Sequence, residues 1–419
     1  DLYRRPKSPK LKTDIAWARS ESNKFRNAFE GRLKGLDGNG LARAISRYEK
    51  ITERLDRVMS YGHLLHATHI SDAEISAFFQ TLQEKVTDIS TEILFFTLEL
   101  NRLGETVLKK QLKSPKAARY APWIRDCRVF RRHQLSDEAE KLLHEKSLTS
   151  LNAWIRLFGE TMADLRFRVE GGKKPKQMTL ADTLNLLSDK KAQVRKRGAK
   201  ALSRGLAKNI RVLSLITNTL AKDKEIEDQW RRYPHPASYR NLSNQVEDEF
   251  VDALIGAVKD SYPRLSHRYY RLKAKWFGVR KLNTWDRNAP LPEDSNRHYS
   301  WGEARQIVLS AFGGFAPEMS EIAERFFDHG WIDAAPRPGK DSGAFAHPTV
   351  PSVHPYVMLN YHGKGRDVMT LAHELGHGVH QVLAAPQGAL MSDTPLTLAE
   401  TASVFGEMLT FQVMLKTEK

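Results

Sequence analysis

The sequence contains very little cysteine, because Cys127 is the only one among 419 residues. A single thiol excludes a disulfide within the chain and a metal site built from several thiolates. This composition is typical of proteins in a reducing compartment, so we expect the chain to be cytoplasmic. We interpret Cys127 as a packed thiol rather than a nucleophile.

Long apolar runs are also missing. The longest ones, such as Ile93-Leu-Phe-Phe-Thr-Leu, are far shorter than the roughly 20 residues that cross a bilayer. The charged start Asp1-Leu-Tyr-Arg-Arg-Pro is not followed by the apolar stretch of a signal peptide. Hydrophobic residues make up 41% of the chain and charged residues 28%, as in soluble globular proteins. We therefore expect no membrane partner.

Acidic residues are outnumbered by basic ones, with 50 Asp and Glu against 66 Lys and Arg, for a formal net charge of +16. Such a charge can attract nucleic acid or acidic partners. The densest basic cluster, residues 190–200, lies on an amphipathic helical pattern, which favours a solvated face. We find no zinc-finger, RNP or helix-turn-helix signature beside it, so nucleic acid is not the expected partner. A basic helical protein that binds nucleic acid or an acidic partner stays the alternative function.

Two regions differ in their patterns. Residues 1–170 have apolar residues at three- and four-residue spacing, which predicts a lobe of long helices. In it, a capping box at Ser71 predicts a helix to Leu103, and Ser136 begins another that reaches Met162. The Gly- and Pro-containing turn at residues 171–175 separates this lobe from a second domain, residues 171–419. Within the second domain, residues 337–360 have the Gly, Pro and β-branched pattern of turns and short strands.

The segment Leu371–His380 contains the pattern H-E-x-x-H as His373, Glu374 and His377. On a helix, residues four apart lie one turn apart on the same face, so both imidazoles can reach one point. Two neutral imidazoles in this arrangement suit Zn²⁺, and Glu374 is placed to act as general base for a metal-activated water. Ordinary surface or core histidines are the alternative, but the flanks have the apolar pattern of a buried active-site helix: Val368, Met369, Leu371, Ala372, Leu375, Val379 and Val382.

A catalytic zinc needs a third protein ligand and an open position for water. The next helical pattern, residues 396–409, carries Glu400 among Leu398, Ala399, Ala402 and Val404. An unpaired carboxylate would be costly there, and a metal removes that cost, so we expect Glu400 to be the third ligand. Glu407 lies two turns further along nearly the same face. It is either an outer partner that orients a ligand imidazole or a solvated helix residue.

The short strands before the H-E-x-x-H helix could hold a peptide along an exposed edge through main-chain hydrogen bonds. Gly343 and Ala344 would let the two backbones approach closely, although a plain structural turn explains them equally well. Tyr361, His362 and His380 are further candidates for substrate contacts. Each of these histidines also fits a structural role, because a fourth metal ligand would close the open position.

Four segments are distinctive: Ser342-Gly-Ala-Phe-Ala-His-Pro, Pro355-Tyr-Val-Met-Leu-Asn-Tyr, Asp367-Val-Met-Thr-Leu-Ala-His-Glu-Leu-Gly-His and Thr397-Leu-Ala-Glu-Thr-Ala-Ser-Val-Phe-Gly-Glu. In these segments the chain resembles the oligoendopeptidase F branch of the thimet oligopeptidase family of zinc metallopeptidases. The resemblance implies one zinc ion held by His373, His377 and Glu400, with Glu374 as base. It also implies a mainly α, two-lobed zincin-type metallopeptidase with a small β-sheet beside the H-E-x-x-H helix.

The resemblance further implies a deep channel that admits short peptides and excludes folded proteins, so the expected activity is that of an oligopeptidase. In the family, helices beyond the third zinc ligand carry histidine and tyrosine residues that bind substrate. We expect that region, the C-terminal part of the catalytic domain, to have been cut away or to sit on a separate fragment that completes the fold. A fragment that binds metal without catalysis is therefore a further alternative.

Overall fold

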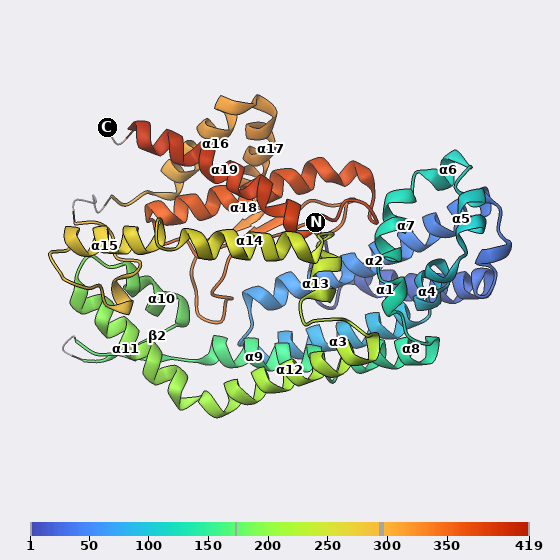
Figure 1. Ribbon diagram of the computed structural model, residues 1–419, viewed down its shortest axis with the longest axis horizontal. Helices are drawn as coiled ribbons and strands as arrows, with labels where there is room; N and C mark the ends of the chain where they lie inside the picture. The colour runs from blue at the N-terminus through green and yellow to red at the C-terminus, as the bar shows by residue number, and fades with distance from the viewer. Residues whose placement is uncertain (1, 172–173, 293–296, 418–419) are drawn as a thin grey trace.

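The computed structural model describes residues 2–171, 174–292 and 297–417. It is mainly helical and contains only short strands, as the sequence predicts (Figure 1). Within those residues, none of the helices is both long enough and apolar enough to cross a membrane. The predicted turn at residues 171–175 includes residues 172 and 173, which lie outside the described residues.

The first part of the chain forms helices around an apolar core, as the three- and four-residue spacing predicts. That core includes Phe25, Ile45 and Phe96, each fully buried. Its elements are α1 (Pro9–Phe29), η1 (Leu33–Gly35), α2 (Gly38–Thr68), α3 (Ala73–Thr91), α4 (Leu94–Arg102), α5 (Glu105–Gln111), α6 (Pro115–Ala118), α7 (Ala121–Arg128), η2 (Arg131–His133), α8 (Asp137–Lys146) and α9 (Leu151–Asp164).

The predicted cap at Ser71 and the predicted continuity of two helices in this part are wrong. The side chain of Asp72, not Ser71, caps α3 by accepting hydrogen bonds from the backbone N–H groups of Glu74 and Ile75. The expected helix to Leu103 is broken between α3 and α4. Ser136 does cap α8, as predicted, but the helix expected to reach Met162 is divided into α8 and α9. The apolar spacing continues across both breaks, so periodicity alone could not locate them.

The middle of the chain returns along the first part, because α12 packs against α9 (Figure 1). On α11, the basic cluster is not wholly solvated: Arg195 is buried and forms a 2.7 Å ion pair with Asp286. The elements are β1 (Phe167–Val169), β2 (Lys176–Met178), α10 (Leu180–Asn185), η3 (Leu186–Ser188), α11 (Ala192–Lys208), α12 (Ile210–Arg231), α13 (Ser238–Ser243), α14 (Asp248–Ser261), α15 (Ser266–Trp276) and η4 (Thr284–Asp286).

A second apolar core lies among the last helices and a three-stranded sheet. The strand order is β3-β5-β4, with β3 parallel and β4 antiparallel to β5, so β4 is an edge strand. The predicted strands between residues 337 and 360 are thus confirmed. The elements are α16 (Trp301–Phe315), α17 (Pro317–Asp328), β3 (Ile332–Asp333), β4 (Phe345–His347), β5 (Tyr356–Met358), α18 (Gly365–Ala384), η5 (Ala385–Gln387) and α19 (Leu396–Thr417).

The loop before β4 is held by the end of α2. The backbone N–H of Asp341 donates to the carbonyl oxygen of Ala67 at 2.8 Å, and that of Ile70 donates to Gly339 at 2.7 Å. In β4 itself, the imidazole of His347 contacts the Ser60 hydroxyl of α2 at 3.0 Å. These contacts join the two predicted domains at the sheet. The division of the chain at residue 170 stays a prediction.

The buried side chain of Lys340 also fixes the loop before β4. Its ammonium group, whose side chain is 0% exposed, donates to the Asp333 carboxylate and to the carbonyl oxygens of Asp333, Ala335 and Leu359 at 2.7–3.1 Å. A lysine is almost never buried without such partners. The ammonium therefore ties the loop to β3 and to the end of β5.

Replacing Lys340 by Met should lower the free energy of unfolding by about 3 kcal/mol, because four acceptor atoms, buried or partly buried, lose their shared donor. Lys281→Met, at an exposed lysine, is the matched control and should change stability by less than about 0.5 kcal/mol. Urea denaturation of the three proteins measures the difference. Equal midpoints for both variants would contradict this account of the loop.

Candidate metal centre

The H-E-x-x-H segment lies in the middle of α18, as predicted. Packing against the core and hydrogen bonds at the N-terminus fix the position of this helix. Its core-facing side packs Val368, Leu371 and Leu375 into the second apolar core. At its start, the Asp367 carboxylate accepts hydrogen bonds from the backbone N–H groups of His362 and Lys364, both at 2.9 Å. The histidines therefore project from a helix whose position is fixed.

A very close approach of α18 and α19 forms the centre. A Cβ atom at Gly376 would lie 2.6 Å from the carbonyl oxygen of Ala402, and one at Gly406 would lie 2.9 Å from that of Ala372. Neither position has room for a side chain unless the backbones move apart. Because glycine in a helix interior costs about 1 kcal/mol relative to alanine, such glycines indicate close packing. These two glycines within helical patterns are a signal of the crossing that sequence reasoning missed.

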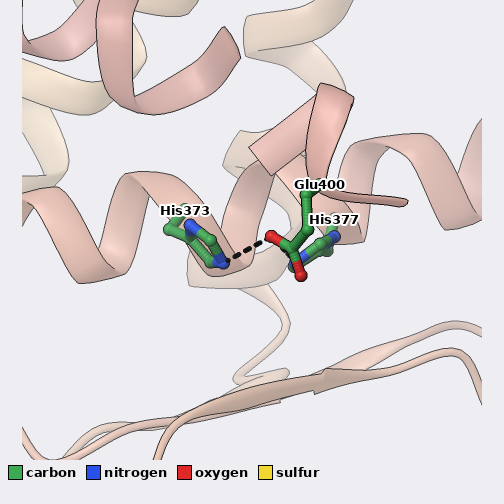
Figure 2. Close-up of side chains that lie close together, drawn as sticks. All are labelled: His373, His377 and Glu400. Atoms are coloured by element: carbon green, nitrogen blue, oxygen red, sulfur yellow. Dashed lines mark ion pairs between the residues drawn. The ribbon is translucent and has the colours of Figure 1, made fainter. Parts of the chain in front are cut away.

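His373, His377 and Glu400 converge at this crossing (Figure 2). Glu400 Oε2 lies 3.3 Å from His373 Nε2 and 3.6 Å from His377 Nε2, and one ligand atom from each residue lies within 4.8 Å of the others. Tetrahedral zinc with bonds of about 2.0–2.2 Å places its ligand atoms roughly 3.3–3.6 Å apart. The donor types and the two separations from Glu400 to the imidazoles therefore fit a zinc ion with three protein ligands.

Each of the three converging side chains also contacts a further residue of α19. Glu407 Oε1 lies 2.5 Å from His373 Nδ1, and a ring N–H of His377 hydrogen-bonds to the carbonyl oxygen of Ala399. The Ser403 hydroxyl donates to Glu400 Oε2 at 2.7 Å. Such outer contacts fix the orientation of imidazole ligands in metal sites. Sequence reasoning suggested Glu407 but missed Ala399 and Ser403.

The centre is open to solvent on the Glu400 side, where the Glu400 side chain is 54% exposed against 26% for His373 and 16% for His377. The expectation that Glu400 is buried among apolar neighbours is therefore wrong, and Leu398 and Val404 are themselves exposed. Avoiding a buried charge is thus no reason to place a metal at Glu400, and the assignment of Glu400 as a ligand stays a prediction. Exposure leaves room for water and a substrate at the centre.

Glu374 is not one of the three converging side chains. It is only 6% exposed, and burial, together with the negative charges of Glu400 and Glu407, raises its pKa to about 7. The neighbouring His373 and the backbone N–H of Ala346, which hydrogen-bonds to the carboxylate, act in the opposite direction. A carboxyl group with a pKa near neutrality can both accept and donate a proton.

The free edge of β4 lies beside Glu374. In the preceding loop, the groups of Gly343 are occupied: its N–H donates to Asp341, and its carbonyl oxygen accepts from the Asn360 amide. Ala344 has no hydrogen-bond partner among the described residues. Of the two residues predicted for backbone contact with a substrate, Ala344 is thus the one whose backbone groups are available.

The remaining predicted substrate residues lie at different places. The hydroxyl of Tyr361 donates to the carbonyl oxygen of Tyr299 at 2.9 Å, and the Tyr361 ring packs against the second apolar core. His362 lies in the loop before α18, where its backbone N–H donates to the Asp367 carboxylate. His380 is half-buried on α18 and close enough to His377 to lower its pKa. Their substrate contacts stay predictions, and the structure gives Tyr361 a structural partner.

Two protein-family models match parts of this chain. The model of peptidase family M3 matches residues 185–419, and that of oligopeptidase F matches residues 99–167. Oligopeptidase PepF of Bacillus subtilis (strain 168) is 25% identical over 403 residues, which cover 92% of this chain and 58% of that protein. The chain thus spans little more than half the length of this relative.

Solved structures have the same fold. PZ peptidase A with inhibitor 2 aligns with a TM-score of 0.76 at 16% identity, over 98% of this chain and 70% of the other. Oligoendopeptidase-F from Enterococcus faecium aligns with a TM-score of 0.66 at 20% identity, over 98% of this chain and 68% of the other. The mainly helical fold with a small sheet, expected from the sequence, is confirmed.

Replacing Gly376 by Ala should weaken zinc binding at least about tenfold, because the new methyl group forces α19 and its ligand away from α18. The control is Gly256→Ala in α14, where a Cβ atom meets nothing within 4 Å. Competition with a chromophoric chelator measures both affinities. Unchanged zinc affinity in Gly376→Ala would contradict the role of the close crossing.

Glu407→Gln tests the outer contact to His373. The amide keeps the shape of the side chain but loses the negative charge, so zinc affinity should fall about 10- to 100-fold. Glu321→Gln, at an exposed glutamate of α17, is the control and should bind zinc as the unmodified chain does. If both variants bind equally well, Glu407 is only a solvated helix residue.

Proposed function

The chain belongs to peptidase family M3, in its oligopeptidase F branch, and on that premise we propose that it hydrolyses peptide bonds in short peptides. The observation that carries the proposal is the convergence of His373, His377 and Glu400 beside a buried, protonatable Glu374. In this proposal the first three residues hold zinc and the fourth transfers protons.

When bound, zinc supplies a Lewis acid that polarises the scissile carbonyl group and acidifies water. The protein holds the histidines for this task through Glu407 and the carbonyl oxygen of Ala399, which leave the Nε2 atoms facing Glu400. Because Glu400 is half exposed, substrate and water can reach the centre from its side.

Glu374 moves the protons of the reaction. Its carboxylate accepts a proton from the attacking water and then delivers that proton to the nitrogen of the leaving amine. Burial supports this role, since it raises the pKa of the group to about 7 and brings its protonated and ionised forms close in free energy. Glu374 is therefore the general base and then the general acid.

The backbone of Ala344 provides a place for the peptide. An extended peptide can pair with the N–H and C=O groups of an edge strand and of its continuation, and such pairing does not depend on the side chains of the peptide. The proposed substrates are accordingly short, unfolded peptides of varied sequence. The histidine and tyrosine contacts expected from the family are not part of this proposal.

The proposal is tested by zinc content and by cleavage of quenched-fluorescent peptides, for the unmodified chain and for Glu374→Gln. Both proteins should bind one zinc ion, and the variant should cleave at least about 100-fold more slowly, because it cannot accept the proton. Glu318→Gln, at an exposed glutamate of α17, is the control.

Equal cleavage by the unmodified chain and Glu374→Gln would contradict the role of Glu374. Zinc binding by the unmodified chain without cleavage would instead support a metal-binding chain that is catalytically silent.

A further inference from the structure

Both backbone groups of Ala346 face away from the rest of the sheet. On β5, the N–H groups of Val357 and Leu359 donate to Trp331 and Asp333, toward β3. The groups of Tyr356 and Met358 therefore face β4, where the register pairs them with His347 and Phe345. The N–H and C=O of Ala346, between those two residues, lie on the free edge.

These two groups are held by α18 rather than by another strand. The N–H of Ala346 donates to the Glu374 carboxylate, and its carbonyl oxygen accepts from Gln381 Nε2 at 3.2 Å. Glu374 and Gln381 are seven residues apart, which places them two turns apart on the same face of the helix. Both backbone groups of Ala346 are thus hydrogen-bonded to side chains of α18.

From this arrangement we propose that Gln381 is a positioning residue, which holds the Ala346 backbone so that its N–H orients the Glu374 carboxylate. This inference rests on the proposed function, in which Glu374 transfers the protons. Among the described residues, Ala346 is the one hydrogen-bond donor to that carboxylate, so its position decides where the carboxylate lies. The hydrogen bond of Gln381 goes to the Ala346 carbonyl oxygen and not to His373, His377 or Glu400.

The structure also distinguishes this role from a contribution to stability. Gln381 Oε1 is buried and has no hydrogen-bond partner among the described residues. Replacing Gln381 by Met removes that unpaired acceptor together with the donor, in a side chain of similar length. Removing an unpaired buried acceptor offsets the loss of one hydrogen bond, so the thermal midpoint should change little.

Gln381→Met should lower kcat about tenfold and leave KM and zinc stoichiometry unchanged, because the contact matters for the base and not for substrate or metal binding. Gln381→Glu keeps the shape but places an acceptor against the Ala346 carbonyl oxygen, so it should lower kcat at least as much. In the slower Glu374→Asp background, Gln381→Met should cause no further loss, since the two residues act as one unit. Gln387→Met, at an exposed glutamine of η5, should change nothing.

Hydrogen exchange of the Ala346 amide provides a readout that needs no activity. The amide should exchange at least tenfold faster in Gln381→Met and in Glu374→Ala than in the unmodified chain and in Gln387→Met. Unchanged exchange in Gln381→Met would overturn the proposal even if the chain cleaves no peptide, whereas absent cleavage by the unmodified chain bears on the proposed function alone. A raised KM with unchanged kcat, or an equal loss in the Glu374→Asp background, would also overturn it.

Discussion

The close packing of α18 against α19 is the constraint on which the metal centre depends. Gly376 and Gly406 let the two backbones approach to a distance that no side chain would permit. At this distance one helix supplies the two imidazoles, and the other supplies Glu400 and both outer contacts to the imidazoles. The ligand geometry is therefore a property of the helix crossing and not of either helix alone.

In the proposed mechanism, the small sheet has the complementary task of placing Glu374 and the peptide. Its edge strand is fixed to α2 through the preceding loop and to α18 through Ala346. A helix from the first part of the chain thus helps to set the position of Glu374, more than 300 residues later in the sequence. The Bacillus subtilis relative aligns over 92% of the chain and therefore over both parts.

The sequence predicted what is local and missed what depends on tertiary contacts. The spacing of His373, Glu374 and His377 is a property of one helix, and the strand near Tyr356 has a clear β pattern, so both were predicted correctly. Glu400 does lie beside the two imidazoles, but it lacks the burial for which it was chosen. Two contacts join different segments of the chain: the close crossing of the helices at Gly376, and the hydrogen bonds between Ala346 and α18. Residue periodicity describes one segment at a time, so it cannot predict which segments meet in these contacts.

X-ray absorption at the zinc K-edge is the most direct test of the central claim, that two imidazoles and one carboxylate from crossing helices bind one metal ion. For the zinc-loaded chain, the account predicts two nitrogen ligands and at least one oxygen ligand at about 2.0–2.2 Å, with one imidazole lost in His377→Ala. A spectrum with oxygen ligands only, or one that is identical in His377→Ala, would contradict it.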